Sequence, residues 1–137
     1  MTGPTVFTAE WADAWCAALN GSDAYRRAGT NWEGDVVLVM SAEADSPERA
    51  VHLDLHRGEC RGARIATAAD IAGARYVMEA APGTWRELLG GRTPPLMALM
   101  SGRLRLTRGS LAALVPFAGA ASELVAAAVR MNSEFAG

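Results

Sequence analysis

Three consecutive strand patterns, separated only by turn signals, constrain the fold more than any other feature of the chain. Residues 34–41 form an apolar run rich in β-branched side chains, which is typical of a strand covered on both faces. Residues 50–57 alternate between apolar and polar side chains, as a half-buried strand does. A third pattern covers residues 60–66, and the links are too short for a helical crossover. The three segments therefore predict an antiparallel meander.

Two more strands and several helices complete the predicted order of elements. We expect the strands at residues 74–80 and 102–107. Thr8 is placed to cap a helix whose apolar stripe is Trp11, Trp15 and Leu19. Further helices are expected at residues 22–27, for one turn after 67, at 82–90, at 94–101 and from 109 onward with a break around 116–119. Strands in runs with the helices set aside predict an α+β fold. We expect one domain over residues 1–137, with a five-stranded, mainly antiparallel sheet covered on one face by helices.

The charge pattern argues against a nucleic-acid-binding protein. The chain has a formal net charge of −2, and like charges do not cluster into long runs. A nucleic-acid footprint needs a clustered basic face, and a polybasic membrane anchor needs one as well. All the basic residues are arginine, which is typical of a GC-rich, actinobacterial genome, and no lysine is present to form a Schiff base.

From the cysteines and the N-terminal residues we expect a cytoplasmic protein. Cys16 and Cys60 belong to no CxxC pair, so we expect two reduced thiols, and neither a metal nor another cofactor. The N-terminal residues lack the charged and apolar regions of a signal peptide. The longest apolar stretch, Leu111 to Val129, contains Pro116, Gly119 and Glu123, and we do not expect it to span a membrane.

His52, Asp54 and His56 form the most suggestive polar cluster, on one face of a predicted strand. At about 3.3 Å per residue the two histidines lie about 13 Å apart, too far to share one metal ion. Because the alternating leucines point inward, we expect the three polar side chains to face water or another subunit, and we expect no catalytic role for them. The chain also lacks the GxSxG, HExxH, P-loop and GxGxxG signatures.

The segment from Thr84 to Ser110 resembles the sterol-carrier-protein-2 domain family. The matching features are a helical tryptophan, a glycine, a proline three residues before an alanine, a Met-x-Gly stop, a basic-apolar strand and a second glycine. In this chain they are Trp85, Gly91, Pro95, Ala98, Met100, Gly102, Arg103–Leu106 and Gly109. Ser110 stands where the family usually has an acidic residue. The expected order of elements agrees with the family across roughly residues 20 to 125.

The resemblance implies a lipid tunnel between the sheet and the helices, closed on one side by the last helix. Alternation along strands and spacing along helices then select the side chains expected to line it. The predicted ligand-binding residues are Leu53, Leu55, Ile65, Met78, Trp85, Met97, Met100, Leu104, Phe117 and Leu124. Methionine suits such a wall because its flexible side chain adapts to ligands of imprecise shape.

Three functional hypotheses follow from this reading. The first is a carrier or sequestering protein for a fatty acyl, sterol-like or polycyclic apolar ligand. It would act as a monomer or homodimer, with at most transient membrane contact. The second is a small biosynthetic enzyme, a cyclase or isomerase, that uses the same cavity to position its substrate. The third is an interaction domain whose cavity is filled by its own side chains.

Overall fold

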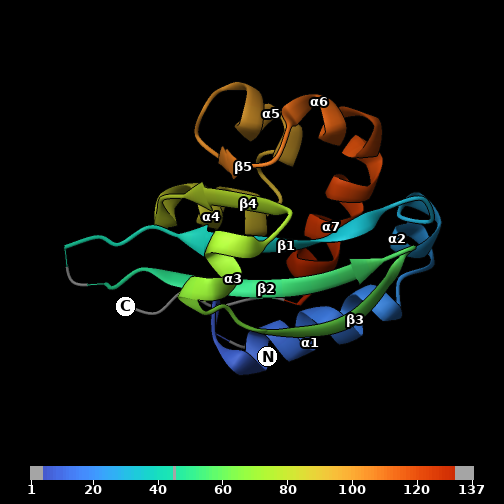
Figure 1. The fold of residues 1–137 in the computed structure, drawn as a ribbon, viewed down its shortest axis with the longest axis horizontal. Coiled ribbons are helices and arrows are strands. Elements are labelled where there is room, and N and C mark those ends of the chain that lie inside the picture. Colours follow the sequence, from blue (N-terminus) through green and yellow to red (C-terminus); the bar gives the residue numbers. More distant parts are fainter. Residues whose placement is uncertain (1–4, 45, 132–137) are drawn as a thin grey trace.

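A computed structural model describes residues 5–44 and 46–131 and contains one five-stranded sheet (Figure 1). The strands are β1 (Glu33–Met40), β2 (Arg49–His56), β3 (Glu59–Ile65), β4 (Tyr76–Ala80) and β5 (Arg105–Arg108), in the spatial order β3-β2-β1-β4-β5. The pairs β1–β2, β2–β3 and β4–β5 are antiparallel, whereas β1 and β4 are parallel. The α+β fold with a mainly antiparallel sheet is thus confirmed, and each strand begins within three residues of its predicted start.

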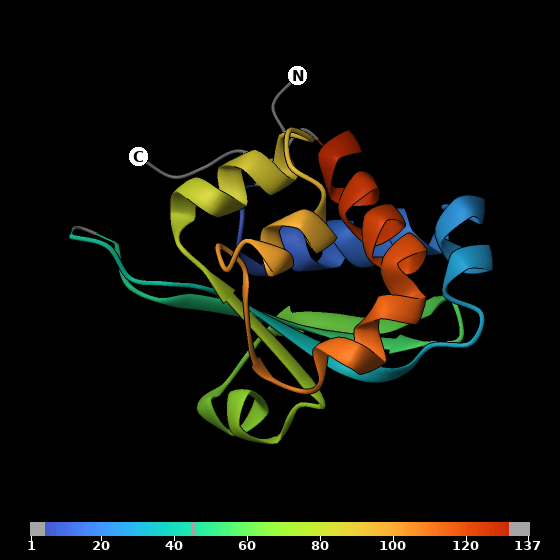
Figure 2. The same ribbon diagram turned by 90° about the horizontal axis from the view of Figure 1, so that it is seen from above.

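Most of the helices lie on one face of the sheet. They are α1 (Ala9–Asn20), α2 (Asp23–Ala28), α4 (Pro82–Leu89), α5 (Pro95–Met100), α6 (Leu111–Leu114) and α7 (Ala118–Arg130), and one turn of 3-10 helix, η1 (Val115–Phe117), joins the last two. Figure 2 shows α3 (Ala68–Gly73) on the opposite face, so the sheet is not covered on one face alone.

The two faces explain why β1 is apolar at successive positions. Val36, Leu38 and Met40 belong to the main core under the helices. Val37 and Val39 belong to a small second core that also contains Ala50, Ala74 and Val77, with Ile71 of α3 packed against it. Because strand side chains alternate between faces, a strand that is covered on both sides must be apolar throughout.

Local sequence signals set the first helix and fix its position on the sheet. Thr8 Oγ1 accepts a hydrogen bond of 3.2 Å from the Trp11 N–H, the geometry of an N-cap. Trp11, Trp15 and Leu19 are fully buried along one side of α1, which packs across β2 and β3. At the other end, the Asn20 side chain forms two hydrogen bonds with the main chain of Cys60, its amide donating at 2.9 Å and its carbonyl accepting at 2.8 Å.

The turn between β2 and β3 brings α2 close to the end of the sheet. Gly58 has a φ of +82° and follows Arg57, which has a φ of +52°. A Cβ atom on Gly58 would lie 2.3 Å from the carbonyl oxygen of Arg26 in α2. Only glycine allows both the left-handed conformation and this approach, and the contact places Tyr25 of α2 at the main core.

Candidate functional site

An apolar cavity of about 80 Å³ lies between the sheet and the helices. Side chains of β1, β2 and β4, with Leu104 just before β5, line its sheet side, and every helix on that face contributes to the rest of the wall. The lining residues are Trp15, Tyr25, Trp32, Val36, Leu38, Leu55, Met78, Trp85, Leu88, Pro95, Leu96, Leu99, Leu104, Leu114, Phe117, Ala118, Ala120, Ala121, Leu124 and Val125. None of these side chains carries a charge.

The tryptophans of the wall present carbon rather than hydrogen-bond donors to the cavity. Each indole N–H donates to a main-chain carbonyl: Trp15 to Leu124 at 2.9 Å, Trp32 to Gly34 at 2.9 Å and Trp85 to Val39 at 3.0 Å. A buried indole N–H requires such a partner, and once paired it has no further donor to offer. The rings therefore act as apolar surface.

Among the described residues that line the cavity, only Tyr25 has a titratable side chain. Burial, with a smaller contribution from nearby Cys60, raises the pKa of Tyr25 to about 12. The phenol is consequently neutral across the physiological pH range, and the cavity carries no charge from its own side chains.

Six of the ten residues predicted to bind a ligand lie in the cavity wall. They are Leu55, Met78, Trp85, Leu104, Phe117 and Leu124. They come from both the sheet and the helices, as expected for a cavity that lies between the two. Their role in binding a ligand stays a prediction.

The other four lie elsewhere. Leu53 is fully buried, but it belongs to the part of the core where α1 packs across β2. Ile65, the last residue of the edge strand β3, is 44% exposed. Met97 and Met100 are 60% and 74% exposed, because the short helix α5 turns Leu96 and Leu99 toward the cavity instead. The prediction that these four side chains line the cavity is therefore not supported by their placement.

Several wall residues were not predicted as such. Trp15 lies on the predicted apolar stripe of α1, and Trp32 precedes β1, so each carried a signal of burial but none that pointed to a cavity. Val36 and Leu38 belong to a run that is apolar at every position, so the sequence does not show which face of the sheet each side chain occupies. Ala121 is one of three alanines that α7 contributes, and alanine gives no pattern of its own.

Of the helical elements that line the cavity, α6 and η1 are the most lightly packed. Neither α6 nor η1 contains a buried residue, and the buried residues of α7 are Ala120, Ala127 and Ala128. By contrast, α4 buries Trp85, Leu88 and Leu89. Side chains that are only partly buried remove less apolar area from water than fully buried ones, so detaching α6 and η1 costs less free energy than detaching α4.

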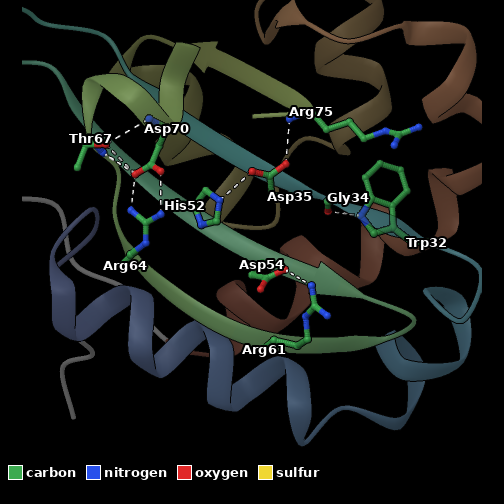
Figure 3. Close-up of polar contacts among 10 residues, drawn as sticks. All are labelled: Trp32, Gly34, Asp35, His52, Asp54, Arg61, Arg64, Thr67, Asp70 and Arg75. Carbon is green, nitrogen blue, oxygen red and sulfur yellow. Dashed lines mark hydrogen bonds and ion pairs between the residues drawn. The ribbon is translucent and has the colours of Figure 1, made fainter. Parts of the chain in front are cut away.

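A polar network occupies the outer face of the sheet (Figure 3). Its hydrogen bonds join His52 to Asp35 at 2.9 Å and Asp54 to Arg61 at 3.0 Å, and Arg64 pairs through both nitrogens with Asp70. Contrary to expectation, the side chain of His52 is only 12% exposed, because Asp35 lies against it from β1; His56 remains 36% exposed. These polar groups form hydrogen bonds with one another, as polar side chains with a structural role do.

The carboxylate of Asp35, on β1, has two hydrogen-bond donors. It accepts from the main-chain N–H of Arg75 at 2.9 Å as well as from His52. Burial acts to raise the pKa of Asp35, but the hydrogen bonds from Arg75 and His52 outweigh it, so the pKa is lowered from 3.8.

The two cysteines are free thiols that connect α1 with β3. Cys16 Sγ donates to the carbonyl of Cys60 at 3.3 Å. Burial, followed by the neighbouring Cys16 thiol, raises the pKa of Cys60 far above its ordinary value. Within residues 5–44 and 46–131, no three His, Cys, Asp or Glu side chains come together as a metal site.

The helical stretch Leu111–Arg130 is long and apolar enough to cross a membrane by length and composition alone, with a mean hydropathy of 1.7. The predicted break at Pro116 produces only the turn η1, after which the helix continues. In the fold, α7 packs against α1, α2, α4 and α5 of the same chain. A single helix of this kind is weak support for a membrane span, because packed helices of globular proteins meet the same criterion.

Comparison with known proteins identifies the fold and the family. No protein-family model matches the chain, and no curated protein sequence does. A crystal structure of sterol carrier protein 2 matches with 46% identity and a TM-score of 0.85, covering 92% of this chain and 98% of the other. A Thermus thermophilus protein described as possibly a sterol carrier protein has 43% identity and a TM-score of 0.86, covering 98% of this chain and 94% of the other.

A more distant structure shares the fold alone. Sterol carrier protein 2 of Yarrowia lipolytica, in its apo form, is 15% identical with a TM-score of 0.59, covering 85% of this chain and 87% of the other. The first two structures match almost the whole of both chains at more than 40% identity. The chain therefore belongs to the sterol-carrier-protein-2 family.

Proposed function

We propose that this protein binds a fatty acyl or sterol-like ligand in the cavity between its sheet and helices, and carries or sequesters that ligand in the cytoplasm. The observation that carries the proposal is the chemistry of the wall. It is uncharged, and each of its three tryptophans has its N–H bonded to the main chain. Such a wall favours burial of an apolar ligand and has few hydrogen-bonding groups for a polar substrate.

The size of the cavity implies that the ligand opens it. A volume of about 80 Å³ is about half that of an engineered 150 Å³ cavity that holds benzene. An acyl chain or a sterol therefore fits only after part of the wall moves. We assign this movement to α6 and η1, which contain no fully buried residue.

The energetics permit useful affinity despite the cost of opening. Each buried methylene contributes about 0.8 kcal/mol, so about ten of them supply about 8 kcal/mol, which corresponds to a micromolar Kd. Association and wall opening reduce this figure, and the rest of a long chain offsets the reduction.

The alternative of an enzyme has no specific observation in its favour among the described residues. Tyr25 is the titratable side chain in the wall, and its raised pKa of about 12 makes it a poor acid or base at neutral pH. We therefore favour carriage over catalysis.

Native mass spectrometry of the purified protein tests the proposal. We expect a co-purified lipid, or a one-to-one complex after addition of a fatty acid, and competition between that fatty acid and a fluorescent fatty-acid probe in titration. A well-folded protein that binds neither fatty acids nor sterols would overturn the proposal and favour a cavity filled by its own side chains.

A further inference from the structure

A second hollow, separate from the apolar cavity, lies beside α2. It is open to solvent and has a volume of about 480 Å³. Its lining residues are Asp23, Arg26, Arg27, Thr30 and Arg57. Three of the five are arginine and none is apolar, in contrast to the uncharged wall of the cavity between sheet and helices. We call this hollow the arginine pocket.

The three arginines come from two places that are far apart in the sequence. Arg26 and Arg27 belong to α2, whereas Arg57 lies in the turn between β2 and β3, which Figure 1 shows beside α2. Two glycines allow the contact: a Cβ atom on Gly58 would lie 2.3 Å from the carbonyl oxygen of Arg26, and one on Gly29 would lie 3.3 Å from the Cα of Gly58. The close approach of the two main chains therefore gathers the arginines into one pocket.

Arg57 has a conformation that the turn itself does not favour. It has a φ of +52° and is followed by Gly58 with a φ of +82°. A two-residue hairpin turn with two positive φ angles favours Asn-Gly, and a long side chain in this conformation is strained. The side chain is 67% exposed, and its ion pair with Glu33 is exposed as well, so neither packing nor that pair repays the strain. Strain of this kind is a feature of binding sites.

Two of the guanidinium groups are held at one nitrogen and leave their ends unoccupied. Arg27 donates from Nε to the carbonyl oxygen of Asp23 at 3.3 Å, and Arg57 donates from Nε to the Glu33 carboxylate at 3.2 Å. Neither group uses its terminal nitrogens in a hydrogen bond or ion pair with a described residue. Each therefore presents a pair of parallel N–H donors, the geometry that binds phosphate through two hydrogen bonds.

The pocket has an excess of positive charge. Arg26 Nη1 lies 4.0 Å from Asp23 Oδ1, which is beyond hydrogen-bond distance, and the Asp23 side chain is 85% exposed. Even with Glu33 included, three arginines face two carboxylates. The chain as a whole has a formal net charge of −2. A local positive charge in an acidic protein favours an anionic ligand at this position.

We propose that the arginine pocket binds a soluble anion that carries two or more phosphate groups, such as a diphosphate. The unoccupied ends of Arg27 and Arg57 each match one phosphate. Because no apolar residue lines the pocket, it offers nothing to cover the chains of a lipid. The proposal goes beyond the function proposed above and does not depend on it, since Tyr25 takes part in the apolar cavity while Arg26 and Arg27 line this separate pocket.

Calorimetric titration with inorganic pyrophosphate tests the proposal. We expect saturable one-to-one binding by the wild type, and weaker binding of orthophosphate and sulfate. Arg27→Gln and Arg57→Gln should each raise the Kd at least about ten-fold, because each removes charge-assisted hydrogen bonds. Arg49→Gln is the matched control, since Arg49 is an exposed arginine at the other end of β2 and outside the pocket. Its Kd should stay within about two-fold of the wild-type value, because salt screens distant charges.

The variant Arg57→Asn separates ligand binding from a structural role. Asparagine suits this position of the turn, so the Tm should rise while the Kd for pyrophosphate increases at least about ten-fold. If Arg57 serves only its ion pair with Glu33, the Tm falls instead and the Kd is unchanged, which would overturn the proposal. A folded wild type without saturable binding at millimolar pyrophosphate would also overturn it, as would an equal loss of affinity in Arg49→Gln.

Two further measurements identify the source of the phosphate and separate this pocket from the apolar cavity. Displacement of pyrophosphate by a short-chain phosphatidic acid at a lower concentration than orthophosphate requires would overturn the assignment to a soluble anion. A saturating fatty acid should leave the Kd for pyrophosphate unchanged, and Arg57→Asn should bind a fluorescent fatty acid as the wild type does, because Arg57 does not line the apolar cavity. Either pocket can therefore fail its test without affecting the other.

Discussion

Filling the cavity from α7 should block ligand binding without unfolding the protein. Ala121 lines the cavity on the helix face that also carries Ala118, Leu124 and Val125. The substitution Ala121→Leu adds three carbon atoms. Scaled from benzene in a 150 Å³ cavity, three carbons need about 75 Å³, close to the 80 Å³ present. The new side chain should therefore occupy the space that a ligand first enters.

The expected magnitude follows from the area that the ligand can no longer bury. Three methylene equivalents at about 0.8 kcal/mol each correspond to about 2.4 kcal/mol, or an increase in Kd of about 50-fold. The same burial stabilises the free protein, and overpacking costs about 1–3 kcal/mol in the other direction. The Tm should consequently change little while affinity falls strongly.

Titration with a fluorescent fatty acid measures the Kd, and calorimetry measures the Tm. Ala17→Leu is the matched control, since Ala17 is an exposed residue of α1 outside the cavity wall; its Kd should stay within about two-fold of the wild-type value. If Ala121→Leu is folded and binds as tightly as the wild type, the ligand does not occupy this cavity. If the larger side chain lowers the Tm strongly, Ala121→Val repeats the test with less added volume.

Three further predictions concern stability. Gly58→Ala should lower the free energy of unfolding by at least about 1–2 kcal/mol in urea titration, because its Cβ would lie 2.3 Å from the Arg26 carbonyl at a φ of +82°; an unchanged urea midpoint would refute this. Asn20→Ala should cost about 1–2 kcal/mol and speed hydrogen exchange at the Cys60 amide, whose partner it removes; unaltered exchange would count against that bond. Burial acts to raise the pKa of Asp35, but hydrogen bonds lower it below 3.8, so the ionised form adds stability that is lost as the pH falls below about 4. Asp35→Asn should therefore be more destabilising at neutral pH than at about pH 3, and an equal effect at both would contradict the assignment.

Local signals predicted the order and bounds of the elements because they act within a few residues. The Thr8 cap appears in the structure as predicted, and a capping box of Thr67 and Asp70 begins the turn expected after residue 67. Alternation in residues 50–57 likewise predicted β2, because a half-buried strand requires a period of two. The family resemblance of the segment from Thr84 to Ser110 is confirmed by structures that match almost the whole chain.

Which side chains meet at the cavity was decided by tertiary packing. Four of the six residues of α5 are Leu or Met, so no periodicity distinguishes the inward Leu96 and Leu99 from the outward Met97 and Met100. Leu53 takes the expected face of its strand, but α1 rather than the cavity lies above it. The position of α3 on the far face likewise depends on the long-range contact of Ile71 with the second core. The periodicity of a sequence predicts whether an element is a helix or a strand and which of its faces is apolar. Which other element packs on that face depends on contacts between residues far apart in the chain.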